Sequence, residues 1–428
     1  MLASLPIILT EPTTAMVALP ATDSVFPLDL SHVRSAYNLV LTAERTAAVG
    51  DQKMYARVMG FLMINLYGAR STLGDTPLLK VTKEVVSCNP STTVDADIRA
   101  LGLQYCERLL RAFRQAKGPP PAPSNHVSRL SFDTIQDMIN DCMDPSPKDY
   151  RAARKAVLAR DGFRCMLTDT YDHISTKKSQ QLLLRQRRAG HGVTYVQCCH
   201  ILSESTTQNI NPDDPAQQQR RDYASSVFAV LKLFGLGSVV ATLTAPVGIH
   251  HLSNLLSLRT ELHTAFDDLE LWLEATSEKN TYEVCVAQAA FFKGQPYLKR
   301  MVHFEVNPDI ASAGKVLPPL PDPKLLAIHA VCAKVAHMSG AAEYFDKFDC
   351  DVEDITVLSQ DGTSAPLLAG LLTRKLTIQN LLLNPLKVSF NYLTQLTVHG
   401  PSNVECLEAC AERHASEIMN SKPSPVWK

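Results

Sequence analysis

The chain has 428 residues, of which 45% are hydrophobic and 20% are charged, and its formal net charge is −1 at pH 7. This composition is typical of folded globular domains. It excludes global disorder and a polycation that binds nucleic acid through its total charge. At about 150 residues per domain, the length predicts two or three domains.

The cysteine pattern favours free thiols. Eleven cysteines are scattered along the chain without a Cys-x-x-Cys pair, and the closest are the neighbours Cys198 and Cys199. A zinc ribbon, a thioredoxin-type motif and a disulfide scaffold are therefore not expected. We expect an intracellular protein of the nucleus or the cytoplasm, although no run of five basic residues marks nuclear import.

Neither a secretion signal nor a membrane segment is expected. The apolar start of the chain has no Lys or Arg before Arg34, and Pro6 and Pro12 interrupt it, unlike a signal peptide. The most apolar later stretch, residues 233–249, is broken by glycine and proline and is too short to span a bilayer. The sequence therefore predicts a soluble protein that is neither secreted nor membrane-bound.

Residues 1–28 are rich in proline and threonine and are expected to form an irregular lead-in. From residue 29 to residue 117, apolar residues recur at spacings near 3.6, which predicts a domain of amphipathic helices. The sequence GPPPAPSN then ends this pattern, because three consecutive prolines cannot continue a helix. We interpret residues 118–146 as a proline-rich linker with one short helix at 132–143.

A second domain is predicted over residues 147–290, and its fold class is α+β. Its first helix is expected to have Ser146 as N-cap and Pro147 in the first turn, and to end at Arg160. Periodicity predicts the remaining elements in chain order, which are a strand at 193–201, a helix at 215–235, a helix at 257–268, and a hairpin of strands at 269–275 and 281–287. Residues 291–428 are expected to form an extension of loops and two or three helices.

Residues that can bind a metal ion or transfer a proton recur in a fixed order through this second domain. Cys165 lies after the basic helix, His200 ends the predicted strand, Asn254 begins a short apolar run, and His263 and Asp267 lie four residues apart on a helix. Residues four apart share one helical face, with Cβ atoms about 5–6 Å from each other. An imidazole nitrogen and a carboxylate oxygen can therefore converge on one divalent cation.

This ordered set resembles the HNH, or ββα-metal, nuclease superfamily, and most closely its His-Ile / Asn / His-x-x-Phe-Asp subgroup. The segment Arg-Asp-Gly-Phe-Arg-Cys at 160–165 and the Leu-Trp-Leu-Glu strand after the helix are similar to large fungal proteins with HNH nuclease domains. The resemblance covers residues 147–290 and implies a ββα-metal fold with an insertion at 203–250. The helical N-terminal region and the C-terminal extension would flank this module as recognition or oligomerisation elements.

The resemblance implies a role for each residue. His200 would be the general base, Asn254 would hold the loop that orients it, and His263 and Asp267 would bind one divalent ion, Mg²⁺, Mn²⁺ or Zn²⁺. Many relatives have a metal ligand directly before the catalytic histidine, where this chain has Cys199. A thiolate there would favour zinc, but a buried thiol without a metal is the alternative.

Charge segregation points to a polyanionic partner. Between Lys148 and His200 the chain has eleven Lys and Arg against four Asp, a local charge of +7. Phosphate contacts to DNA, or to RNA as the alternative, are expected from part of this set, namely Arg160, Arg164, Lys177, Lys178, Arg185, Arg187 and Arg188. A solvated insertion is the other interpretation of the same charges. His250 and His251 are interpreted as loop residues near the site.

Two functions of different classes remain open. One is a metal-dependent nuclease, and the other is a degenerate HNH fold that binds nucleic acid or protein without cleavage. Convergence of His263 and Asp267 and access of solvent to His200 would favour the nuclease. A closed zinc site with four ligands is disfavoured, because paired Cys and His ligands are lacking. The sequence does not predict the substrate's specificity or the oligomeric state.

Overall fold

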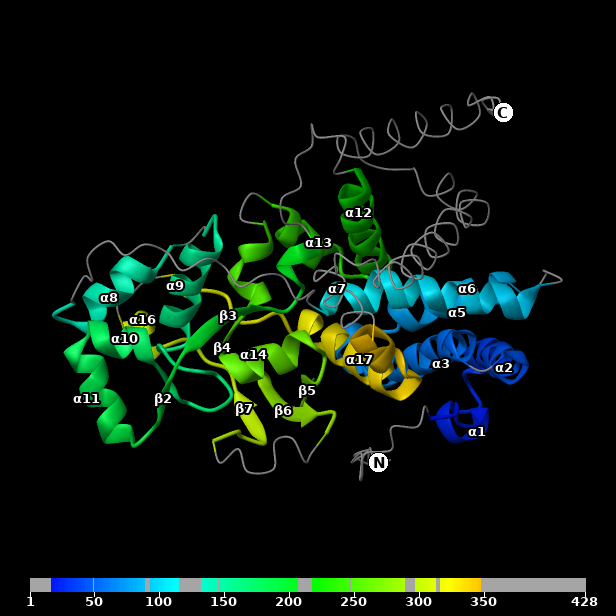
Figure 1. Cartoon of the computed structure of the whole chain (residues 1–428), viewed down its shortest axis with the longest axis horizontal. Helices are drawn as coiled ribbons and strands as arrows, with labels where there is room; N and C mark the ends of the chain where they lie inside the picture. The colour runs from blue at the N-terminus through cyan, green and yellow to red at the C-terminus, as the bar shows by residue number, and fades with distance from the viewer. Residues whose placement is uncertain are drawn as a thin grey trace, which may run out of the picture. The chain divides into compact units, whose positions relative to one another are not determined.

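The computed structural model describes residues 17–48, 50–88, 93–114, 132–144, 147–206, 218–245, 248–288, 297–312 and 316–347. The chain divides into two compact units, residues 1–358 and 359–428, and every described residue belongs to the first (Figure 1). The GPPPAPSN segment, Ser146 and any helices after residue 347 lie outside the described residues.

The first part of the chain is helical, as its periodicity predicts. Its elements are α1 (Thr22–Val25), α2 (Ser31–Thr46), α3 (Asp51–Gly68), α4 (Arg70–Leu73), α5 (Thr76–Cys88), α6 (Val94–Tyr105), the π-helical η1 (Cys106–Leu110) and α7 (Arg111–Phe113). Helix α3 is buried along most of its length because α2, α6 and the late helix α17 (Pro323–Ser339) pack around it. Helix α17 is apolar on nearly all sides, which is the pattern of a core helix.

A ββα unit lies at the centre of the second region. Strand β3 (Val196–His200) pairs antiparallel with β4 (Leu255–Arg259), with Cys199 opposite Leu256, and α14 (Thr260–Asp267) follows β4 directly. The helix predicted at 257–268 therefore begins three residues late. Residues 255–258 are fully buried between β3 and the core, and this pairing outweighs their local helical pattern.

Helix α9 (Tyr150–Arg160) packs against β3 and β4. Its N-cap is Asp149, whose side chain accepts a hydrogen bond from the Ala152 N–H at 2.8 Å. The predicted start at Ser146 and Pro147 is therefore wrong by three residues. A carboxylate at this position also lies at the positive end of the helix dipole, and the attraction between the two stabilises the start of the helix.

The other elements surround this unit. Between α9 and β3 lie β1 (Tyr171–Asp172), α10 (His173–Lys178), α11 (Gln180–Ala189) and β2 (Val193–Thr194), with α8 (Ile135–Cys142) before α9. The insertion contains η2 (Glu204–Thr206), α12 (Gln218–Leu233), α13 (Gly237–Thr244) and η4 (Gly248–His250), and η5 (Leu252–Asn254) follows it before β4. The predicted hairpin is present as β5 (Leu271–Ala275) and β6 (Thr281–Val286), extended by β7 (Met301–His303) before α16 (Pro308–Ser312).

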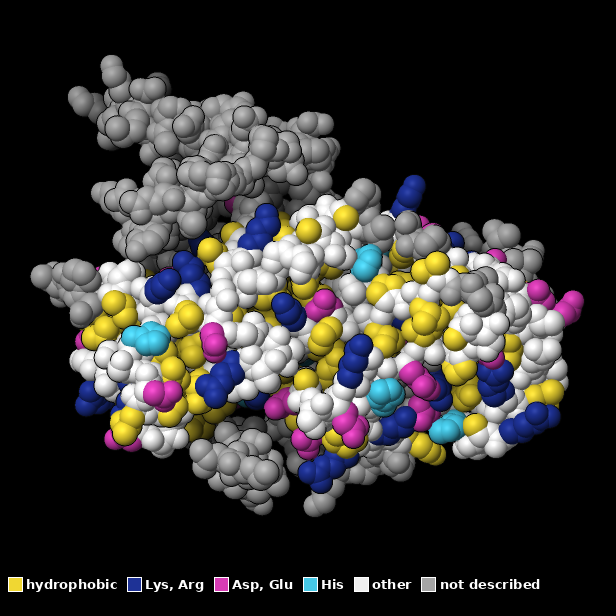
Figure 2. Space-filling model, turned by 180° about the vertical axis from the view of Figure 1, so that it is seen from behind, with side chains coloured by type: hydrophobic (Ala, Val, Ile, Leu, Met, Phe, Trp, Pro, Cys, Tyr) yellow, Lys and Arg dark blue, Asp and Glu magenta, His cyan; other side chains and the backbone are white. Residues whose placement is uncertain are grey.

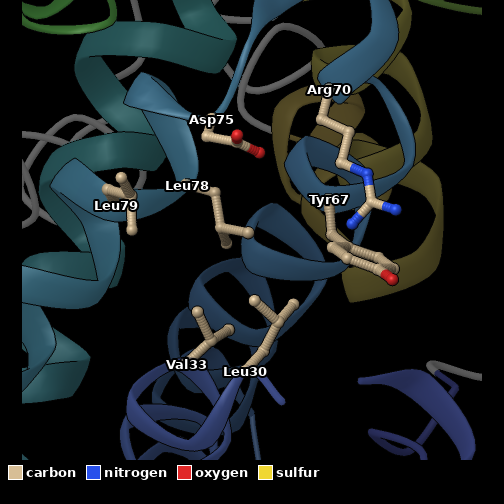
Figure 3. A pocket seen from close by; sticks show the side chains of 7 residues that line it. All are labelled: Leu30, Val33, Tyr67, Arg70, Asp75, Leu78 and Leu79. Atoms are coloured by element: carbon tan, nitrogen blue, oxygen red, sulfur yellow. The ribbon is translucent and has the colours of Figure 1, made fainter. Parts of the chain in front are cut away.

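A pocket of about 420 Å³ opens in the helical region (Figure 3). Its lining is mostly apolar and comes from α2 to α5 and the residues just before α2 and α5, and Arg70 of α4 lies over the ring of Tyr67 with Cζ 4.2 Å from the ring centroid. None of the histidines or cysteines discussed below lines it. No single described helix is long and apolar enough to cross a membrane, and α17 passes that test only together with residues 341–347, against which it is bent by 84°.

Candidate metal centre and general base

The alternation of β3 sends its side chains to two different helices. Gln197 and Cys199 face α14, where Gln197 contacts His263 and Cys199 contacts Asp267. Cys198 faces α9 and packs in a separate apolar cluster with Ala153, Ala156 and Val157. Two strand residues span about 6.7 Å, and four helical residues span about 6 Å. Because these two lengths are similar, Gln197 and Cys199 on β3 can each contact one residue of the pair His263 and Asp267 on α14.

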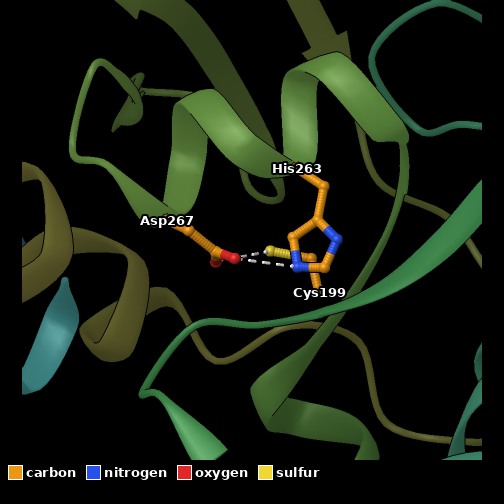
Figure 4. A group of neighbouring side chains, drawn as sticks. All are labelled: Cys199, His263 and Asp267. Atoms are coloured by element: carbon orange, nitrogen blue, oxygen red, sulfur yellow. Dashed lines mark hydrogen bonds and ion pairs between the residues drawn. The ribbon is translucent and has the colours of Figure 1, made fainter. Parts of the chain in front are cut away.

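The three predicted metal ligands, Cys199, His263 and Asp267, converge in the structure (Figure 4). Their ligand atoms lie within 4.8 Å of one another, with His263 Nε2 at 3.1 Å from Asp267 Oδ2 and Cys199 Sγ at 3.8 Å from Asp267 Oδ1. Thiol, imidazole and carboxylate are all zinc ligands, and three protein ligands leave room for water or substrate. The residues therefore fit a catalytic rather than a structural ion.

Gln197 is a residue that the sequence analysis missed. Its Oε1 lies 2.7 Å from Nδ1 of His263, so Nδ1 carries the proton and donates it. The lone pair of Nε2 then faces the Asp267 carboxylate, and only a proton or a cation between these two atoms makes the contact favourable. Its place two residues before Cys199, on the same face of a predicted strand, could have indicated that Gln197 lies beside the metal ligands.

The Cys199 side chain is fully buried. Burial, and then the negative charge of Asp267, raises the pKa of the Cys199 thiol well above its usual value. The sulfur therefore keeps its proton until a metal ion replaces it, so metal binding at this group releases a proton.

His200 ends β3 on the side of α9 and is only 4% exposed. Its ring lies 6.3 Å from the ring of Tyr150 and 5.2 Å from the ring of His250. Burial lowers the pKa of His200 to about 3, with His250 and His263 as further causes, so the imidazole is neutral at physiological pH. The ligands thus converge as the nuclease hypothesis requires, while the base is covered, which is the condition that favours the degenerate fold.

His250, which the sequence pattern placed in a loop near the site, contacts the buried His200. His200 Nε2 lies 3.1 Å from His250 Nδ1, within hydrogen-bonding distance. On its other side, His250 Nε2 lies 3.7 Å from Oε1 of Glu204. Glu204 and His250 come from the two ends of the insertion, so the insertion begins and ends at the candidate base. His251, by contrast, turns its Nδ1 to Ser253 at 2.7 Å.

Asn254 fixes the backbone at both ends of the insertion. Its Oδ1 accepts a hydrogen bond from the Leu202 N–H at 2.8 Å, and its Nδ2 donates to the carbonyl groups of Leu202 at 3.1 Å and Ile249 at 2.9 Å. Leu202 lies midway between His200 and Glu204, and Ile249 precedes His250. The carboxamide thereby ties together the backbone segments that carry these three side chains.

Arg160 corrects one sequence prediction. Its side chain is fully buried, pairs with Asp161 at 2.7 Å, and donates to the carbonyl groups of Leu252 at 2.7 Å and Leu255 at 2.9 Å. A guanidinium in this position cannot reach a phosphate. It instead fastens α9 to the chain on both sides of Asn254, because five N–H donors can hold several carbonyl groups at once.

The other predicted phosphate contacts differ in accessibility. Arg185 is paired with Asp309 at 2.6 Å, and Arg164 lies 3.6 Å from Asp169. Lys177, Arg187 and Arg188 on α10 and α11 are exposed and form no ion pair with other described residues. On the face seen in Figure 2, Lys and Arg side chains are interspersed with Asp and Glu rather than gathered in one patch.

A comparison with known protein families matches the part of the chain that holds the candidate site. Residues 165–273 match the family described as HNH endonuclease, a span that includes the metal group, His200 and Asn254. The match covers about a quarter of the chain. No curated protein matches the chain, and no solved structure does. The match places this segment with the HNH superfamily and supports, in general terms, a nuclease that acts on nucleic acid with a divalent metal.

Proposed function

We propose that the chain is a metal-dependent nuclease that hydrolyses phosphodiester bonds of DNA, with RNA as the alternative substrate. The observation that carries the proposal is the convergence of Cys199, His263 and Asp267 within 4.8 Å, on the elements that the HNH match covers. The segment is further proposed to belong to the His-Ile / Asn / His-x-x-Phe-Asp subgroup, with similarity to fungal proteins. Its location is proposed to be the nucleus or the cytoplasm.

Each side chain has a defined part in this reaction. His200 takes the proton of the attacking water, which a neutral imidazole can do because one nitrogen has a free lone pair. Cys199, His263 and Asp267 would hold the ion, which would stabilise negative charge on the phosphoryl group and the leaving oxygen. Gln197 holds the ring of His263, and Asn254 holds the segment around His200. His200 is buried and its Nε2 contacts His250 Nδ1, so this mechanism requires the His250 ring to move aside and admit the attacking water.

Two observations favour the second candidate, a degenerate HNH fold that binds without cleaving. His200 is buried, and a cysteine replaces the hard ligand that many relatives have before the histidine. A module of this kind would keep the ββα unit and its exposed basic side chains. It would not need a base that water can reach.

Nicking of supercoiled plasmid distinguishes the two functions. Purified full-length protein is assayed in Mg²⁺, Mn²⁺ or Zn²⁺ and with EDTA, beside His200→Ala and the neighbouring control His251→Ala. We expect metal-dependent nicking that EDTA abolishes and that His200→Ala lowers by about 10²- to 10⁴-fold, the usual contribution of a general base. His251→Ala should keep the activity, because its ring contacts Ser253 rather than His200.

A further variant tests the metal ligand. Cys199→Asp replaces a soft ligand by a hard one, so the most effective ion should change from Zn²⁺ toward Mg²⁺. Absence of cleavage in every metal, by folded protein that still shifts DNA on a gel, would establish the degenerate module instead. Retained activity in His200→Ala would exclude His200 as the base.

A further inference from the structure

A second group of metal-ligating side chains lies beside the first. His200, His250 and Glu204 each offer one ligand atom, and these atoms lie within 4.8 Å of one another. We propose that these three residues form a second divalent-cation site of the zinc type, and that an ion bound there blocks His200. The binding stands on its own geometry, while the inhibitory consequence rests on the proposed nuclease function.

The spacing of the two imidazoles supports this site. Two nitrogens bound to one tetrahedral zinc at about 2.0–2.1 Å are about 3.3 Å apart. His200 Nε2 and His250 Nδ1 are already 3.1 Å apart, so the rings need little movement to share an ion. An ion at this position replaces the proton that the two nitrogens otherwise share.

The third ligand completes a recognised donor set. Two histidines and one glutamate form catalytic zinc sites in other proteins, and imidazole favours zinc and related transition metals over magnesium. Glu204 supplies the negative charge. Its Oε1 lies 3.7 Å from Nε2 of His250, not from the Nδ1 that contacts His200, and it offers a carboxylate oxygen within 4.8 Å of a ligand nitrogen of each histidine. The side chains of His250 and Glu204 are 12% and 18% exposed, so the site is sheltered but open to an ion from solvent.

The backbone around the site is already fixed. Asn254 is hydrogen-bonded to Leu202, which lies between His200 and Glu204, and to Ile249, which precedes His250. Few backbone changes are therefore needed to bring the ligands together, and preorganisation of this kind lowers the cost of binding. An ion bound here occupies the lone pair of Nε2 and holds His250 over the base. The site would switch the nuclease off at high zinc.

Zinc stoichiometry tests the site without any assay of activity. Full-length protein is stripped of metal and titrated with Zn²⁺ by calorimetry, and the bound metal is measured after dialysis. We expect two equivalents for the wild type. One equivalent is expected for the double variant Glu204→Gln/His250→Gln, and one for Cys199→Ser/Asp267→Asn. The matched control Glu261→Gln/His251→Gln should keep two, and circular dichroism should show that every variant is folded.

Cobalt distinguishes the two ions by their spectra. Co²⁺ at the Cys199 group should give a near-ultraviolet thiolate band, which Cys199→Ser/Asp267→Asn removes and Glu204→Gln/His250→Gln keeps. A wild type that binds one equivalent, or a Glu204→Gln/His250→Gln variant that still binds two, would overturn the proposal. The contact between His200 and His250 would then be a hydrogen bond only.

Inhibition tests the consequence separately. Nicking in Mn²⁺ is measured with increasing Zn²⁺, and each protein is compared with its own activity without zinc. Glu204→Gln should need on the order of tenfold more Zn²⁺ for half-inhibition, equivalent to about 1.4 kcal/mol of lost affinity. Equal inhibition of wild type and Glu204→Gln would refute the switch. A chain without nuclease activity would refute the proposed function and leave the stoichiometry decisive for the site.

Discussion

Gln197 shows how one neutral side chain prepares a metal ligand. A histidine that binds a metal through one nitrogen almost always donates its other N–H to a partner, which fixes the tautomer and the ring. Here that partner is Gln197 Oε1 at 2.7 Å from His263 Nδ1, and it comes from the same strand as Cys199. The metal group therefore has its supporting contact within the ββα unit itself.

Removal of this contact should weaken the metal site. Gln197→Leu is expected to lower the affinity of the Cys199 group for zinc by about 10- to 100-fold, the usual effect of losing such a partner. Gln197→Glu keeps an acceptor for the Nδ1–H and should retain most of the affinity. Calorimetric titration measures both, with the exposed Gln180→Leu as control. Unchanged affinity in Gln197→Leu would mean that the orientation of His263 does not depend on this contact.

The residues of the candidate site differ in how far the sequence predicts them. His263 and Asp267 could be paired from their spacing of four, because one helix carries both. Arg160 could not be assigned, because a lone arginine at the end of a basic helix has the same pattern whether it is buried or exposed. His250 could not be assigned either, because its contact with His200 spans 50 residues across an insertion.

Two histidines of α17 hold the end of the metal-binding helix. His329 Nε2 donates to the carbonyl of Phe266, and His337 Nε2 donates to that of Leu269, each at 3.1 Å. The last carbonyl groups of a helix have no partner within the helix, so α17 supplies the missing donors near the end of α14. The His329 ring also stacks on Phe266, with centroids 3.7 Å apart. Asp267 is thus fixed from outside the ββα unit.

His329 makes the stability of this contact depend on pH. Burial lowers the pKa of His329 to about 3, so the folded state keeps this ring neutral where the unfolded chain, with a pKa near 6.5, binds a proton. Its contribution is complete above about pH 6.5 and is lost as the pH falls toward 3. Between pH 7 and pH 5, His329 should cost the folded state about 2 kcal/mol.

A variant without a titrating group tests this dependence. His329→Leu should unfold more easily at pH 7 by about 1–3 kcal/mol, because the Phe266 carbonyl loses its donor in a buried position. Its loss of stability between pH 7 and pH 5 should be smaller than that of the wild type by about 2 kcal/mol. Denaturant unfolding followed by circular dichroism measures both, with the exposed His32→Leu as control. Equal pH dependence in wild type and His329→Leu would contradict the assignment.

At this scale the sequence predicts elements better than their ends. The hairpin of β5 and β6 follows from alternation around a polar turn, and the helices of residues 31–88 follow from a period near 3.6. Residues 257–259 of β4 lie within the predicted helix 257–268, because a strand that is buried on both faces has no alternating polar residues to mark it. Pairing with β3 determines the conformation of β4, and the five residues of β4 alone do not predict this pairing.

The molecule as a whole is joined across long sequence distances. Helix α17, from the predicted C-terminal extension, packs on both α3 and β5, and Arg114 pairs with Asp346 at 2.6 Å. From the insertion, Phe234 stacks with Tyr105 of α6 at 6.1 Å. The insertion therefore connects the helical region with His250 and Glu204, which lie beside the candidate general base His200. Periodicity predicts such helices but cannot predict which of them pack together, since those contacts span more than a hundred residues.

The charge of the molecule gives the last prediction. Because the net charge is −1, binding to nucleic acid must come from a local surface, and the exposed Lys177, Arg187 and Arg188 form the best candidate. The triple variant of these residues to Glu should weaken DNA binding for all sequences alike. It should also reduce the slope of log affinity against log salt by about 2–3, at about 0.9 per phosphate contact.

Fluorescence anisotropy with labelled duplex at several salt concentrations measures the affinity and the slope together. The control reverses three exposed charges of the helical region, Arg45, Arg70 and Lys83, so the net charge changes by the same amount. A surface on α10 and α11 predicts a large loss for the first variant and a small one for the control. Equal losses would assign the binding to total charge, and no loss in either would place the nucleic acid on another surface.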